Sequence, residues 1–99
     1  MPKYLIERQA SGIGNLSERG LQALSLKSNR VLEEMGPKIQ WLHSFVSDDQ
    51  LCCVYISPNE DMIRDHAERG QFPLTRITEV KTIIDPTTAE LNVGQEAAV

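Results

Sequence analysis

Three side chains whose chemistry suits a transition-metal ion lie on separate strand-like segments of this sequence. They are the carboxylate of Glu7, the imidazole of His43 and the thiol of Cys53. Imidazole and thiolate are borderline or soft donors, and they favour late first-row ions such as nickel, copper or zinc over magnesium or calcium. The sequence contains no CxxC or HExxH motif. A metal site therefore requires a fold that brings these strands together.

A second group of side chains could hold a cofactor or small ligand beside the metal site. Its members are Trp41, Tyr55 and Glu79. In an enzyme, Glu7, His43 and Tyr55 would be the acid, base or orienting groups. Cys53 would need a nearby base and a lowered pKa to act as a nucleophile, so a small packing residue is the simpler interpretation. We therefore assign no catalytic residue from the sequence.

The segments that must position these side chains follow the order strand, helix, strand, strand, helix, strand. They cover residues 4–8, 16–35, 39–46, 51–56, 58–69 and 77–84. This βαββαβ order is typical of the ferredoxin-like arrangement. We therefore predict an α+β fold in which two helices cover one face of a four-stranded antiparallel sheet and leave the other face open.

The ends of both predicted helices carry capping signals. Asn15 or Ser17 can cap the first helix. Ser57, with Glu60 three residues later, matches the capping-box pattern for the second helix. Gly70 is expected to end that helix.

Alternation along the strands sorts their residues onto two faces. The expected helix-facing core is Ile6, Leu42, Val46, Val54, Ile56, Val80 and Ile84. The expected open face holds Glu7, Trp41, His43, Phe45, Cys53, Tyr55 and Glu79. With strand order 4-1-3-2, the predicted metal donors could then converge on one small ligand.

This assignment depends on the hairpin between the two central segments. A three-residue loop at 48–50 pairs Ser47 with Leu51 and places His43 opposite Tyr55. A two-residue loop would shift the pairing by one residue, so that His43 would share a face with Val54. We prefer the longer loop because it gives the more uniformly apolar helix-facing side.

The length of 99 residues indicates one domain, at residues 1–86, followed by a polar tail at 87–99. The net charge of −4 argues against nucleic-acid binding. No apolar run approaches the roughly 20 residues that span a bilayer, and the N-terminus does not resemble a signal peptide.

Cys52 and Cys53 are adjacent and point to opposite sides of a strand, so we expect free thiols and a cytoplasmic protein. The apolar open face predicts a homodimer.

Four segments together resemble a known family. They are YLIER at 4–8, WLHSFVSDD at 41–49, CVY at 53–55, and the stretch from ITEV at 77–80 to Asp85 and Pro86. The pattern is similar to small nickel-binding, ferredoxin-like proteins long described as a domain of unknown function, and it covers about residues 2–86. The resemblance implies a ferredoxin-like fold, dimerisation through the sheet faces, and nickel binding in at least one member.

Three interpretations therefore remain open. The first is a dimeric protein that binds nickel or another transition metal in an unknown process. The second is a small-molecule-binding protein or enzyme of the dimeric α/β-barrel type, with a pocket on the open sheet face or between the sheet and the helices. The third is an interaction module without a ligand.

Overall fold

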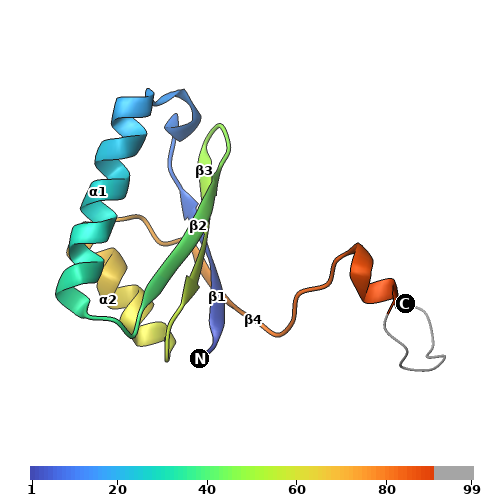
Figure 1. The fold of residues 1–99 in the computed structure, drawn as a ribbon. Helices are drawn as coiled ribbons and strands as arrows, with labels where there is room; N and C mark the ends of the chain where they lie inside the picture. Colours follow the sequence, from blue (N-terminus) through green and yellow to red (C-terminus); the bar gives the residue numbers. More distant parts are fainter. Residues whose placement is uncertain (91–99) are drawn as a thin grey trace.

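The computed structural model describes residues 1–90, and in this part four strands and two helices follow the predicted βαββαβ order. The strands are β1 (Lys3–Gln9), β2 (Gln40–Val46), β3 (Gln50–Ile56) and β4 (Arg76–Val80), and the helices are α1 (Glu18–Met35) and α2 (Glu60–Gly70). The strands form one antiparallel sheet in the order β2-β3-β1-β4. Both helices lie on the same face of this sheet (Figure 1). The predicted α+β fold and strand order are confirmed.

Local capping explains where the helices begin. Ser17 caps α1, since its hydroxyl accepts a hydrogen bond from the Gly20 amide at 3.1 Å. The prediction for α2 was wrong: Asn59 is the cap, and its side chain accepts from the Met62 amide at 3.0 Å. Ser57 is instead buried and donates to the Asn59 carbonyl at 2.8 Å. Asparagine and serine cap helices about equally well, so the sequence pattern did not separate them.

The β2–β3 hairpin has the two-residue turn, so the preferred three-residue loop was wrong. Val46 pairs with Leu51, and the Ser47 amide donates to the Gln50 carbonyl at 2.9 Å. The turn itself is therefore Asp48–Asp49. Relative to the prediction, this shift by one residue exchanges the two faces of β3, whereas Ser44 and Val46 of β2 stay on the helix-facing side.

The loop after β1 holds this turn in place. It contains the short 3₁₀ helix η1 (Ile13–Asn15). The amides of Ala10 and Gly14 donate to the carbonyls of Asp49 and Asp48 at 2.9 and 3.0 Å. The Gly12 amide donates to the Asp49 carboxylate at 2.8 Å. The backbone of the β1–α1 connection thus selects the shorter turn, which local turn preferences did not reveal.

A β-bulge at Leu42 changes the register once more within β2. Trp41 pairs with Tyr55, but the next pair is His43 with Val54. The bulge lets both Trp41 and Ser44 face the helices, and the Trp41 indole donates to the Ser44 hydroxyl at 2.9 Å. Leu42 and His43 consequently project to the open side.

The core lies between the sheet and the helices, and its composition corrects several predictions. The buried side chains of the two central strands are Tyr4, Ile6, Arg8, Leu51, Cys53 and Tyr55. Ile6 was placed correctly. The strand pairings instead put Val54, Ile56 and Val80 on the open side, and Leu42, which is the bulge residue, is 42 % exposed. Val46 borders the helix-facing side but is 45 % exposed.

The sheet ends earlier than predicted. β4 stops at Val80, and the following chain leads away from the body to the 3₁₀ helix η2 (Pro86–Glu90) (Figure 1). Ile84, predicted to be in the core, is 75 % exposed. Of the predicted tail at 87–99, residues 91–99 lie outside the described residues. Within residues 1–90, none of the helices combines the length and apolar character needed to cross a membrane.

Candidate functional site

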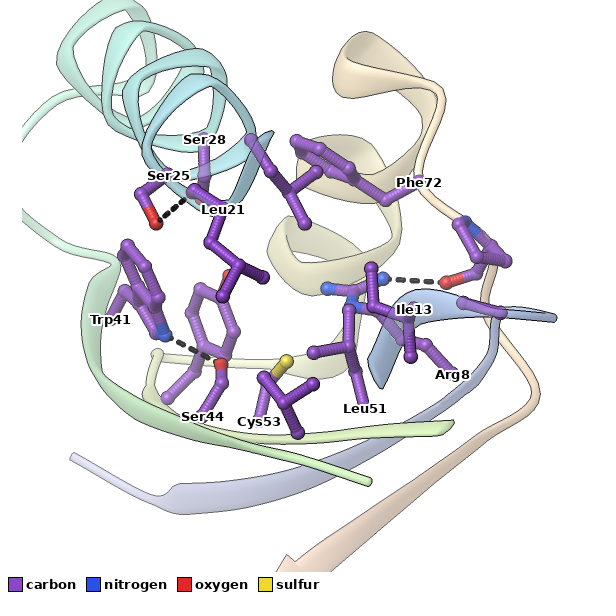
Figure 2. A pocket seen from close by; sticks show the side chains of 15 residues that line it. Arg8, Ile13, Leu21, Ser25, Ser28, Trp41, Ser44, Leu51, Cys53 and Phe72 are labelled. Carbon is purple, nitrogen blue, oxygen red and sulfur yellow. Dashed lines mark hydrogen bonds between the residues drawn. The ribbon is translucent and has the colours of Figure 1, made fainter. Parts of the chain in front are cut away.

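A cavity of about 230 Å³ lies between the sheet and the helices. Most of its wall is apolar, and its large aliphatic and aromatic side chains include Ile13, Leu21, Leu24, Val46, Leu51 and Phe72. Figure 2 shows side chains from α1, the sheet and the segment after α2 pointing toward a common centre. The cavity is therefore part of the space between the layers, one of the two places where we expected a pocket, and does not lie on the open sheet face.

One cationic group is buried in the wall of this cavity. Arg8 is 2 % exposed, and its Nη1 donates to the Pro73 carbonyl at 2.7 Å (Figure 2). Its Nη2 is buried and has no hydrogen-bond partner among residues 1–90. The guanidinium lies 5.6 Å from the centroid of the Phe72 ring. The ion pairs found among residues 1–90 do not include Arg8.

Ser28, Tyr55 and His66 form a polar group between α1, β3 and α2. The Ser28 hydroxyl lies 3.2 Å from Nε2 of His66, whose ring lies 5.3 Å from that of Tyr55. Burial lowers the pKa of His66 to about 4, and the positive charge of Arg8 acts in the same direction. Burial also raises the pKa of Tyr55. At neutral pH both rings are therefore uncharged, and Arg8 supplies the positive charge.

The predicted metal donors do not share one face. Glu7 and His43 lie on the open side, whereas Cys53 is 4 % exposed, faces the helices and lines the cavity. Cys52 takes its place on the open side, as the cross-strand partner of Glu7. Among residues 1–90, no three His, Cys, Asp or Glu side chains are grouped closely enough to hold a metal ion.

The predicted cofactor residues also lie on the helix-facing side. Trp41 and Tyr55 are cross-strand neighbours, and both line the cavity. Glu79 pairs with Tyr4 in the sheet, is exposed, and forms an ion pair with Lys81 at 3.0 Å. The structure therefore brings two of the three together and leaves Glu79 outside the cavity.

Arg8, Ser28 and Phe72 line the cavity but were not predicted as site residues from the sequence. A signal for Arg8 was available, because Ile6 lies two residues earlier on the same strand and was assigned to the core. A charged residue at that position was not considered for the interior, since isolated charges are rarely buried.

On the open side, Cys52 lies beside the carboxylate of Glu7, whereas His43 lies beside the apolar ring of Phe45. Burial raises the pKa of the Cys52 thiol, and the negative charge of Glu7 adds to this effect. The His43 ring packs against the edge of Phe45, with centroids 5.2 Å apart. Glu7 also lies 3.9 Å from Nε of Arg76.

Comparison with known proteins agrees with the resemblance seen in the sequence. The model of the family described as nickel responsive protein SCO4226-like matches residues 4–80. The crystal structure of SCO4226 from Streptomyces coelicolor A3(2) is similar, with a TM-score of 0.69 and 12 % sequence identity over 83 % of this chain and 99 % of that chain. No curated protein sequence matches the chain. At this identity the structural likeness supports the fold alone, and the family match shows that the chain belongs to the SCO4226-like nickel responsive proteins.

Proposed function

We propose that this chain is a nickel-responsive homodimer that binds nickel, or another late first-row divalent ion, between the open sheet faces of two protomers. The observation that carries this proposal is the composition of the open side. Exposed apolar side chains, Phe45 at 63 % and Leu42 at 42 %, lie there beside the metal donor His43. We use the membership in a nickel-responsive family to choose the ion.

The dimer follows from the apolar surface that the helices leave uncovered. Both helices pack on the other side of the sheet (Figure 1). Leu5, Val54 and Ile56 extend the apolar surface across the two central strands. Contiguous apolar patches of this kind usually mark interaction sites. A second copy of the same face would cover both patches and enlarge the small core.

The metal donors available to such a dimer are His43, Cys52 and Glu7. Imidazole and thiolate suit nickel, and Cys52 replaces the buried Cys53 in the predicted set. Glu7 and Cys52 are direct cross-strand neighbours, while His43 on β2 pairs with Val54, two residues further along β3 than Cys52. One protomer leaves these donors too dispersed for a complete site. Two facing protomers would double the donor set, so we place the ion at the interface.

Calorimetric titration of untagged protein with nickel tests this proposal. We expect His43→Ala and Cys52→Ser each to weaken nickel binding about tenfold or more, since loss of a ligand removes a coordinate bond. Cys53→Ser is the matched control and should leave the affinity unchanged, because Cys53 faces the helices. Wild-type protein that binds no nickel, or unchanged affinity in His43→Ala, would contradict the proposal.

The pH dependence gives a second test of the thiol ligand. Burial raises the pKa of Cys52, so its thiol is protonated at neutral pH and must release that proton when it binds the ion. Nickel affinity should therefore fall as the pH falls. The number of protons released, measured in buffers of different ionisation enthalpy, should decrease in Cys52→Ser.

A further inference from the structure

We propose that the cavity between the sheet and the helices binds a small apolar carboxylic acid, whose carboxylate pairs with the free Nη2 of Arg8. This second site is separate from the metal site, and it lies on the other side of the sheet. Its ligand class follows from three properties of the cavity: an unpaired cation, hydroxyl donors among its lining residues, and apolar walls.

The first property is the buried charge of Arg8. Arginine carries a positive charge in proteins, and burying such a charge without an anion is costly. Arg8 is 2 % exposed, and it forms none of the ion pairs seen among residues 1–90. Its contacts with the Pro73 carbonyl and the Phe72 ring offset only part of the cost of burying its charge. An anion in the cavity would supply the missing counter-charge.

The second property is the set of donors that a ligand would meet. Nη2 of Arg8 is buried without a hydrogen-bond partner in the part of the chain that the structure describes, so an N–H group is available to an acceptor. Arginine binds carboxylates with short, charge-assisted hydrogen bonds. The side chains of Ser28 and Tyr55 also line the cavity, and the hydroxyl groups of both can donate to an anion. Among residues 1–90, no carboxylate lines the cavity to compete for these donors.

The third property is the size and lining of the space. At 230 Å³ the cavity is smaller than the range of about 300–1,000 Å³ that is common for drug-sized ligands. Leu21, Leu24, Trp41 and Leu51 form apolar walls. A compact hydrocarbon body would be well packed there, whereas a fully hydrated phosphate or sulfate would lose water without regaining its hydrogen bonds. These features favour a monocarboxylate with a small cyclic or branched body.

Trp41 provides a built-in probe for this binding. It is the single tryptophan of the chain, and it lines the cavity. We would titrate the full-length wild-type protein with cyclohexanecarboxylate, with the uncharged cyclohexanecarboxamide, and with inorganic phosphate, and follow the fluorescence. The carboxylate should bind about tenfold or more tightly than the amide, as expected for a charge-assisted hydrogen bond. Phosphate should not change the signal.

Three variants test separately the charge of Arg8 and the volume of the cavity. Arg8→Met should lose the preference for the carboxylate, so that acid and amide bind with similar affinity. Ser25→Phe should block both ligands, since Ser25 lines the cavity from α1. Ser25→Ala is its matched control and should bind as the wild type does. Circular dichroism confirms that each variant is folded.

The wild-type comparison is decisive even if a variant fails to fold. Equal affinities of the wild type for acid and amide, or no binding of either, would overturn the proposal. Retention of the acid preference by folded Arg8→Met would also overturn it. Because nickel is absent from this experiment, its failure leaves the proposed metal function unaffected.

Discussion

His66 is buried as a neutral ring in the core, and this makes the fold sensitive to acid. It is 1 % exposed, and its ring stacks on Phe72 with centroids 5.2 Å apart. Burial lowers its pKa from 6.5 to about 4, and the charge of Arg8 contributes. Between these two pH values the unfolded chain takes up a proton that the folded chain does not. The contribution of His66 to stability is therefore complete above pH 6.5 and is lost as the pH falls toward about 4.

We predict that the free energy of unfolding decreases by about 2 kcal/mol over this interval, after allowance for solvent screening. Urea unfolding at a series of pH values measures the effect. His66→Gln retains a polar side chain that does not titrate, so its stability should change much less above about pH 5, where carboxylates remain mostly ionised. The same slope in His66→Gln and wild type would show that other groups cause the acid sensitivity.

At the scale of the elements, the close contact between η1 and the β2–β3 turn fixes the hairpin register. A Cβ atom on Gly14 would lie 2.8 Å from both the Asp48 Cα and the Ser47 carbonyl oxygen. Both are backbone atoms, so they cannot move aside as a side chain would. The absence of a side chain at Gly14 thus allows the amide of this residue to reach the Asp48 carbonyl.

We predict that Gly14→Ala destabilises the protein by about 1–3 kcal/mol, since the loop or the turn must shift. Gly20→Ala is the control. Its added methyl group meets only the side chains of Leu16 and Ser17, and alanine is the better helix former within α1. Thermal unfolding should therefore show a clear loss for Gly14→Ala and no loss for Gly20→Ala. Equal melting temperatures for the two variants would contradict the role given to this contact.

The same contact explains which parts of the fold could be predicted from the sequence. Element order and helix ends depend on local signals, and these were read nearly correctly. The register of β2 against β3 depends on Gly14 and on the bulge at Leu42, which are not local turn signals. β3 is apolar on both of its faces, so alternation did not identify the buried side. One consequence was the exchange of Cys52 and Cys53 in the predicted metal site.

At the scale of the whole molecule, the sheet separates the two proposed sites, which differ in chemistry. The helix-facing side holds a mostly apolar cavity with Arg8 in its wall, whereas the open side presents exposed Phe45 and Leu42. The segment after β4 extends away from the body on its own (Figure 1). It carries Ile83 and Ile84, which are 64 % and 75 % exposed. In a dimer, this arm could lie against the partner subunit, where both apolar side chains would be covered.

The introduction of one negative charge on the open face tests whether this face forms the proposed dimer interface. We predict that Phe45→Glu converts the protein to a monomer, because two like charges would have to be buried at a symmetric interface. Leu26→Glu is the matched control, since Leu26 is 48 % exposed on α1, away from the sheet. Analytical ultracentrifugation at micromolar concentration should show that the wild type and Leu26→Glu are dimers.

If the ion lies between protomers, Phe45→Glu must lose nickel affinity together with dimerisation, although His43, Cys52 and Glu7 are all retained. A wild type that sediments as a monomer, or a monomeric Phe45→Glu with full nickel affinity, would show that the interface does not form the metal site.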